Sequence, residues 1–137
     1  MMRSRQRGFS LIELMIVVAV MAILTTIAVP SYRQHVIRSH RTDATAALLR
    51  LAAEQEKFYI QNNRYGTYAE LGSPPTENGW YTVAVPTANI ATFTATATIV
   101  AGGPQDGDPQ CQVFSVNAEG QHLAQDPGGA DSTDACW

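Results

Sequence analysis

The stretch that decides the fold is RQRGFSLIELMIVVAVMAILTTIAVP, residues 5–30, an apolar run that contains one carboxylate, Glu13. The 21 residues from Phe9 to Val29 would rise about 31 Å as an α-helix. That length matches the roughly 30 Å hydrocarbon core of a bilayer. The stretch therefore predicts a helix that can span a membrane, and it raises the question of why an acidic side chain lies inside it.

Arginines precede the apolar run at Arg3, Arg5 and Arg7. They predict that the N-terminus stays in the cytoplasm and that the chain after Pro30 lies outside. A cleaved secretory signal would need a shorter apolar core and a better exit than the sequence AVPS at 28–31. An uncut signal anchor explains the length, but it leaves Glu13 at a cost of about 2.5 to 3.5 kcal/mol near the membrane centre.

A third interpretation explains the carboxylate. If the chain is cleaved between Gly8 and Phe9, a new ammonium forms four residues before Glu13, on the same helical face. In an apolar medium the two charges can pair within one chain or between helices that pack with an axial offset. A misregistered neighbour would bury both charges unpaired. We therefore predict that Glu13 sets the register of assembled helices.

Residues 7–32, RGFSLIELMIVVAVMAILTTIAVPSY, resemble the N-terminal signature of type IV pilins and pseudopilins. The shared features are a short basic leader ending in Gly8, Phe9 as the first mature residue, Glu13 four residues later, and Pro30 after the apolar stretch. The resemblance implies that a prepilin peptidase cleaves after Gly8 and methylates the Phe9 amine. It also implies storage in the inner membrane and incorporation into a helical filament by an assembly platform. The eight-residue leader resembles that of the type IVa branch.

The segment after the apolar run predicts a continuing amphipathic helix. Pro30 lacks a backbone N–H and is expected to kink or weaken that helix. Apolar residues then recur at the spacing of one helical face as far as about residue 61: Ile37, Ala44, Leu48, Leu51 and Phe58. Charged residues, Arg41 and Asp43 among them, are expected mostly on other faces. The tract 61–79, rich in Gly, Pro, Asn and Ser, is expected to be a loop with a short helical turn at 68–71.

Strand signals follow. WYTVAV (80–85) and TFTATATIV (92–100) are rich in β-branched and aromatic residues, and the second alternates apolar side chains with threonines. CQVFSV (111–116) and QHLA (121–124) flank NAEG, a connection suited to a hairpin. The fold class is therefore α+β, with a long helix, hydrophobic and then amphipathic, packed on about four antiparallel strands. The type IV pilin fold that the resemblance implies agrees with this architecture.

The expected organisation is a leader at 1–8, a membrane or filament-core helix at 9–29 and a head at 30–137. Two cysteines, Cys111 and Cys136, lie near the C-terminus of the head. In an exported chain they predict one disulfide in an oxidising compartment. Closing its loop of roughly 26 residues would be worth about 3 to 4 kcal/mol. Two unrelated buried thiols are the alternative.

The C-terminal half also resembles one subgroup, the PilE-type minor pilins of type IVa systems. The resemblance lies in NNRY at 62–65, in C-x-x-F-x-x-N-x-x-G from Cys111 to Gly120, and in the terminal Cys136-Trp137. The resemblance favours a pilus subunit over a secretion pseudopilin. The type II secretion pseudopilin remains the alternative.

No sequence pattern for a nucleophile turn, a zinc-binding helix or a phosphate loop is present, so no catalytic residue and no cofactor are expected. His35, His40 and His122 are expected to be surface or interface residues. Asp106, Asp108, Asp126, Asp131 and Asp134 could offer oxygen ligands to calcium. Their spacing is not that of an EF-hand, and solvated turn aspartates are the favoured interpretation.

The formal net charge is −3, and without the leader arginines the chain carries six basic and twelve acidic side chains. Such acidity disfavours general nucleic-acid binding. The remaining basic residues lie mostly on the helix: Arg33, Arg38, Arg41, Arg50, Lys57 and Arg64. A DNA-binding competence pilin is thus a third function, behind pilus subunit and pseudopilin.

The sequence therefore predicts a structural subunit of a type IVa pilus, most similar to minor pilins, that serves twitching motility, adhesion or DNA uptake. Its expected partners are other pilin subunits, the prepilin peptidase and N-methyltransferase, the inner-membrane assembly platform and membrane lipid. Nucleic acid is not an expected partner. Its expected location is the inner membrane before assembly and the extracellular pilus afterwards.

Overall fold

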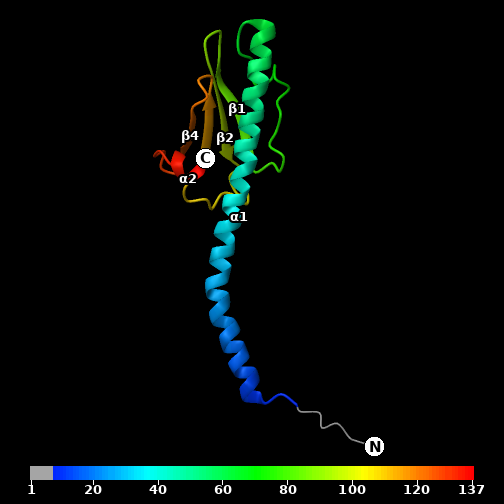
Figure 1. Ribbon diagram of the computed structural model, residues 1–137, viewed down its shortest axis with the longest axis vertical. Helices are drawn as coiled ribbons and strands as arrows, with labels where there is room; N and C mark the ends of the chain where they lie inside the picture. The colour runs from blue at the N-terminus through cyan, green and yellow to red at the C-terminus, as the bar shows by residue number, and fades with distance from the viewer. Residues whose placement is uncertain (1–7) are drawn as a thin grey trace, which may run out of the picture. The chain divides into compact units, whose positions relative to one another are not determined.

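The computed structural model describes residues 8–137 (Figure 1). Within them the elements are α1 (Leu11–Asn62), β1 (Tyr81–Ala88), β2 (Phe93–Ile99), β3 (Val113–Asn117), β4 (His122–Gln125) and α2 (Thr133–Cys136). The chain divides into two compact units with the boundary between Val36 and Ile37. Arg3, Arg5 and Arg7 of the expected leader lie outside the described residues.

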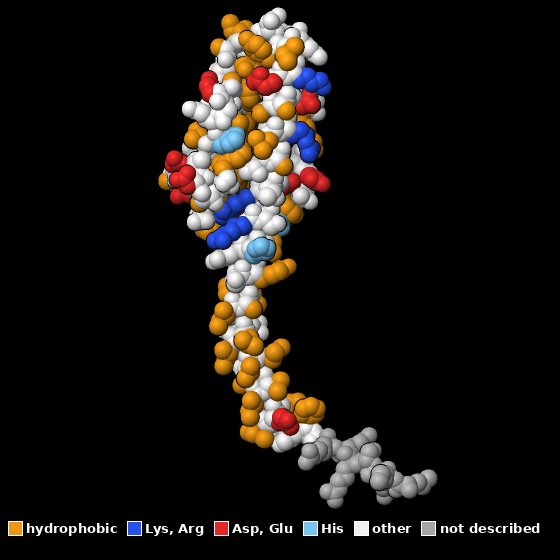
Figure 2. Space-filling model, in the orientation of Figure 1, with side chains coloured by type: hydrophobic (Ala, Val, Ile, Leu, Met, Phe, Trp, Pro, Cys, Tyr) orange, Lys and Arg blue, Asp and Glu red, His pale blue; other side chains and the backbone are white. Residues whose placement is uncertain are grey.

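The face of the first part of α1 that is seen in Figure 2 carries mostly apolar side chains, with one acidic side chain near the start of the helix. From Phe9 to Val29 its large apolar side chains are 49–84% exposed. The hydroxyls of Thr25 and Thr26 donate to the helix's own carbonyls at 2.7 Å, so these polar groups are satisfied within the helix. Among residues 8–137, α1 is the one helix with a stretch long and apolar enough to cross a membrane.

The proline in α1 does not end the helix. Helical structure continues on both sides of Pro30 to Asn62, one residue past the predicted end. The missing N–H of a proline removes one hydrogen bond of the ladder and favours a kink. The kink at Pro30 stays a prediction.

The four strands form one antiparallel sheet in the order β1-β2-β3-β4. Val83, Ala97, Phe114 and Ala124 lie side by side across it and face the core. The threonines of β2 point to the other face, as the alternation predicted. Strand β1 runs further than the predicted 80–85, because a register shift between Ala84 and Thr87 accommodates the proline at 86.

Residues 37–62 of α1 run along one face of the sheet (Figure 1). The helix contributes Ala44, Leu48 and Leu51 to the core, and the sheet contributes mainly Phe93 and Phe114. This arrangement confirms the predicted α+β fold with a helix on a four-stranded antiparallel sheet. The expected polar loop at the C-terminus differs in one respect, because it contains the short helix α2.

Two helix residues expected off the packed face are in fact buried. Arg41 is 6% exposed and Asp43 is 7% exposed. The periodicity of apolar residues could not indicate this, because both side chains are enclosed by loops from distant parts of the chain. The residues that contact the Arg41 guanidinium lie 67 to 94 positions away in sequence.

Candidate functional site

The expected cleavage site lies at an open position before α1. Gly8 and Phe9 are exposed, and a Cβ added at Gly8 would meet no atom within 4 Å among residues 8–137, its own chain neighbours aside. The fold itself therefore does not require glycine at position 8. The expected cleavage after Gly8 stays a prediction.

Glu13 lies in the first turn of α1. Its Oε2 accepts a hydrogen bond from the backbone N–H of Ser10 at 3.4 Å. This contact satisfies one of the free N–H groups at the helix start. The Glu13 side chain is exposed, and it lies one helical turn from Phe9 in sequence. The arrangement is compatible with the predicted pairing to a Phe9 amine, and that pairing stays a prediction.

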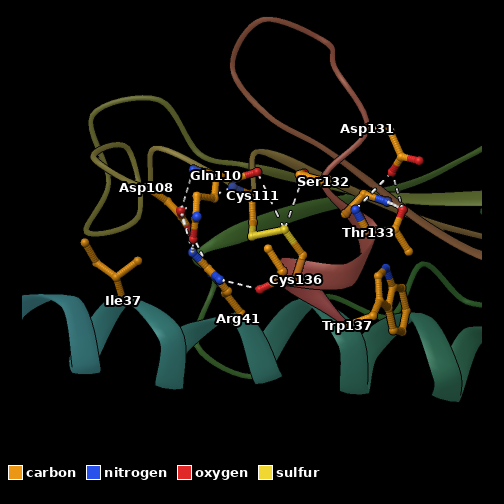
Figure 3. Close-up of a disulfide and its surroundings, with 12 residues drawn as sticks. Ile37, Arg41, Asp108, Gln110, Cys111, Asp131, Ser132, Thr133, Cys136 and Trp137 are labelled. Atoms are coloured by element: carbon orange, nitrogen blue, oxygen red, sulfur yellow. Dashed lines mark hydrogen bonds and ion pairs between the residues drawn. A yellow bond between two sulfur atoms is a disulfide. The ribbon is translucent and has the colours of Figure 1, made fainter.

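A buried ion pair connects α1 to the loop that precedes Cys111 (Figure 3). Arg41 Nε donates to Asp108 Oδ2 at 2.8 Å, and its Nη2 donates to Asp108 Oδ1 at 2.9 Å. Arg41 Nη1 also donates to the carbonyl of Ala135 at 2.9 Å. One guanidinium thus joins α1 to two separate segments of the C-terminal half. Two-point arginine–carboxylate pairs of this kind are among the strongest charged hydrogen bonds.

The predicted disulfide is present between Cys111 and Cys136, whose Cα atoms are 5.8 Å apart (Figure 3). Asp108 Oδ1 accepts the backbone N–H of Cys111 at 3.2 Å. Arg41 contacts Asp108 and Ala135, which lie close in sequence to Cys111 and Cys136. The Arg41 contacts and the disulfide therefore hold the same two segments, 108–111 and 135–136. The C-terminal loop is therefore attached to α1 as well as to the sheet.

Asp108 corrects the expectation that these aspartates are solvated in turns, because it is 1% exposed. Both of its oxygens are bonded to Arg41, so they do not act as calcium ligands here. Asp126 and Asp131 do behave as turn aspartates and accept backbone N–H groups of their own loops. Within residues 8–137 no group of three or more potential ligand side chains could hold a metal ion.

Two histidines stack on tryptophans, which the sequence did not indicate. His40 lies 3.7 Å from the Trp80 ring, and its Nδ1 is 3.0 Å from Gln105 Oε1. His122 stacks on Trp137 at 4.3 Å with the rings nearly parallel. The indole N–H of Trp137 donates to the carbonyl of Leu123. His40 is half-buried and His122 is exposed, so both lie at the surface, as expected, with a tryptophan stacked on each ring.

The loop after α1 is attached to the helix by an amide pair. Gln55 is fully buried and exchanges two hydrogen bonds with the backbone of Gly66, at 2.7 and 2.8 Å. A Cβ at Gly66 would approach the Phe58 ring to 3.1 Å, so a larger residue there would need the Phe58 side chain to shift. Further along the loop Arg64 pairs with Glu70, and the hydrogen bonds from Arg64 and then from Thr67 lower the pKa of Glu70 to about 2.

The positive charges of the head are confined to α1 and the residues just after it. Residues 65–137 contain neither lysine nor arginine. Arg41 and Arg64 are engaged with carboxylates, whereas Arg33, Arg38 and Arg50 are exposed. The described head thus has no basic patch on its sheet.

Comparison with known proteins places these features in a family. Residues 30–115 match the family model described as "Type IV minor pilin ComP, DNA uptake sequence receptor". Residues 3–29 match the prokaryotic N-terminal methylation motif. Together the two matches cover the apolar helix and most of the head.

Two curated relatives and one solved structure are similar to the chain. The type IV major pilin PilA of Myxococcus xanthus is 41% identical over 56% of this chain, which spans only 36% of that protein. The fimbrial protein EcpC of Eikenella corrodens is 36% identical over 77% of this chain and 72% of its own length. The non-core minor pilin PilV of Neisseria meningitidis has the same fold, with a TM-score of 0.58 and 22% identity over 70% of this chain and 93% of that one.

Proposed function

On the premise that the chain belongs to the type IV pilin family, we propose that it is a minor subunit of a type IVa pilus that polymerises through its N-terminal helix. The pilus would serve motility, adhesion or DNA uptake. The subunit would wait in the inner membrane with its N-terminus in the cytoplasm. A prepilin peptidase would remove residues 1–8, and the assembly platform would pass the subunit to neighbouring pilins.

The observation that carries this proposal is the exposed apolar surface between Phe9 and Val29. Fourteen large apolar side chains there would be in water if the chain were alone. Exposed apolar surface of that size indicates a membrane or a protein interface. A pilin uses both in turn, because the same helix is covered first by lipid and then by the helices of other subunits.

In this proposal Glu13 sets the axial register of the packed helices. In lipid a lone carboxylate is costly, and pairing with a Phe9 ammonium of a neighbouring helix reduces the cost. Because the pairing needs a defined axial offset, it favours one register of packing over others. Hydrophobic contact then supplies most of the attraction between helices, and the charge pair supplies the register.

The test is the composition of sheared filaments. Filaments from cells that produce a tagged copy of the chain should contain it in processed form, with Phe9 as the first residue by mass spectrometry. The outer-membrane fraction and a cytoplasmic marker serve as contamination controls. Detection of the chain only in the membrane fraction of piliated cells would contradict the proposal.

DNA uptake is a second candidate role, favoured by the description of the matched family model. The distribution of charge gives it little support, since every lysine and arginine beyond Gly8 lies between residues 33 and 64. A gel-shift titration of the purified chain at low salt would test it. Submicromolar binding with a steep salt dependence would support a DNA receptor. If no shift were seen, the DNA-receptor role would be excluded and the role as a pilus subunit would be the one that stands.

A further inference from the structure

The loop between α1 and β1 contains the dipeptide Asn78-Gly79. Of the asparagines in this chain, Asn78 alone is followed by glycine. Both residues are exposed and lie outside the helices and strands. Gly79 has a φ of +70°, and a Cβ at this position would meet nothing within 4 Å among residues 8–137, its own chain neighbours aside. The space around Gly79 is therefore open.

An asparagine followed by glycine can react with its own backbone. The nitrogen of the next residue must reach the side-chain carbon Cγ, and glycine has no Cβ to obstruct this approach. The attacking N–H must also be free. Among residues 8–137 the Gly79 N–H donates no hydrogen bond. This peptide unit can therefore rotate without breaking a hydrogen bond of a helix or a strand.

The Asn78 amide is attached to the rest of the head by one long contact. Its Nδ2 donates to Asp43 Oδ1 at 3.3 Å, and the Asn78 backbone N–H donates to the same oxygen at 3.2 Å. Both distances are longer than the commonest N–H···O distance, about 2.9 to 3.0 Å. The contact therefore restrains the side chain only weakly, and the amide can leave Asp43.

We propose that Asn78 is a site of spontaneous deamidation in the folded head. The Gly79 nitrogen attacks Asn78 Cγ and forms an N–Cγ bond, the Cγ–Nδ2 bond breaks, and the side-chain nitrogen leaves as ammonia with the Gly79 proton. Water then adds to one of the two carbonyls of the cyclic imide. Opening at Cγ gives aspartate, and opening at the backbone carbonyl gives isoaspartate. The reaction consumes only water and does not depend on the proposed function.

The product carries a negative charge where the loop contacts α1. Asp43 loses its amide donor, and the new carboxylate lies beside it. A pocket of about 180 Å³ lies between α1 and the loop here, and its lining includes Glu77 and Arg50. Three carboxylates then share one arginine. Deamidation should therefore weaken the attachment of residues 77–79 to α1, because an acceptor without its donor and close like charges are both unfavourable.

The reaction is tested by incubating the purified full-length chain in detergent at mildly alkaline pH, followed by mass spectrometry and peptide mapping. The peptide that contains Asn78 should gain the mass of amide hydrolysis, and an isoaspartate-specific methyltransferase should label it. Asn89 is the internal control, because it is also exposed but precedes isoleucine. Gly79→Ala is the matched variant and should slow the mass gain several-fold, because its Cβ obstructs the attacking nitrogen.

Three results would overturn the proposal. Asn89 could gain mass as fast as Asn78, or Gly79→Ala could leave the rate unchanged. Alternatively, Asn78 could remain intact in the folded chain, whether or not it reacts in urea. Reaction in urea alone would mean that the contact with Asp43 protects the amide.

The consequence for the fold is tested with Asn78→Asp, which carries one of the two products from the start. Its thermal midpoint at neutral pH should lie about 3 °C or more below that of the wild type. Asn78→Ala is the control, because it removes the amide without adding a charge, and it should lower the midpoint less. Equal midpoints of Asn78→Asp and the wild type would contradict the predicted weakening. An equal loss in Asn78→Ala would contradict the part assigned to the added charge.

Discussion

Arg41 of α1 and Asp108 of the loop before Cys111 form a buried two-point ion pair, with N–O distances of 2.8 and 2.9 Å. The two side chains are 8% and 0% exposed. Removing one partner of such a pair leaves the other charge buried and unpaired, which is far more costly than losing an exposed ion pair. The pair is therefore expected to be one of the main determinants of head stability.

Asp108→Asn should lower the free energy of unfolding of a soluble fragment spanning 37–137 by about 3 to 5 kcal/mol. The asparagine keeps an oxygen that can accept the Cys111 N–H. The loss of stability therefore measures the effect of removing the negative charge. Lys57→Ala is the control, because the Lys57–Glu54 pair is exposed, and it should cost less than about 0.5 kcal/mol. Urea unfolding measures both. Equal effects of the two substitutions would contradict the assigned role of the buried pair.

Removal of the disulfide by Cys111→Ser with Cys136→Ser should destabilise the same fragment by about 3 to 4 kcal/mol. The C-terminal loop should then exchange its amide hydrogens faster than the core strands do. Because Arg41 still contacts Asp108, the segment around Asp108 should remain more protected than the one around Ala135. If both segments lost hydrogen-exchange protection equally, the disulfide, and not the ion pair, would hold the segment around Asp108.

Gly8→Ile should block processing without disturbing the fold, because a Cβ at this position has open space around it in the described part of the chain. The expected result is a slower, unprocessed band in the membrane fraction and no chain in sheared filaments. Circular dichroism of the purified variant should match that of the unprocessed wild type. If this variant still gave mature protein that starts at Phe9, the peptidase would not need glycine at position 8.

Glu13→Ala should leave membrane insertion intact and reduce incorporation into filaments. The apolar run becomes more hydrophobic, so insertion does not suffer, whereas the partner that sets the register is lost. Quantitative immunoblots of membrane and filament fractions measure the two effects separately. The control is Thr25→Ala, a polar-to-apolar change in the same helix at a residue already bonded within the chain. Normal incorporation of Glu13→Ala would remove the register role.

The Arg64–Glu70 pair should make the loop after α1 sensitive to acid. The pKa of Glu70 is lowered from its ordinary 4.5 to about 2, first by the hydrogen bond from Arg64 and then by those from Thr67. A depressed folded-state pKa means that the stabilisation is complete above pH 4.5 and is lost as the pH falls toward 2. The carboxyl ¹³C shift of Glu70 measures this titration. Arg64→Gln should raise the midpoint, and an unchanged midpoint would exclude the pair as its main cause.

Several elements were predictable because their signal is local. The alternation of Ala95 and Ala97 with threonines gave β2 its two faces, and the four-residue spacing of Ala44 and Leu48 gave α1 its packed stripe. The bounds of these elements agree with prediction within a few residues. Both signals depend on neighbours within one or two turns or one strand.

The polar interior was not predictable. Arg41, Asp43 and Gln55 look like surface residues of an amphipathic helix, and the partners that make their burial favourable come from two loops, one between α1 and β1 and one between β2 and β3. A charged side chain is buried only where a partner meets it. No spacing along the helix records where those loops return.

The amino-acid sequence by itself determined the apolar helix with its single carboxylate, the strand pattern and the pair of cysteines. Each of these follows from hydrophobicity, periodicity or composition over a short stretch of chain. Only the tertiary structure decided that Arg41 joins Asp108 and that Asp43 is buried with one oxygen bonded to Asn78. These facts depend on where segments tens of residues apart meet, because the stability of a buried charge is set by its surroundings in space and not by its neighbours in sequence.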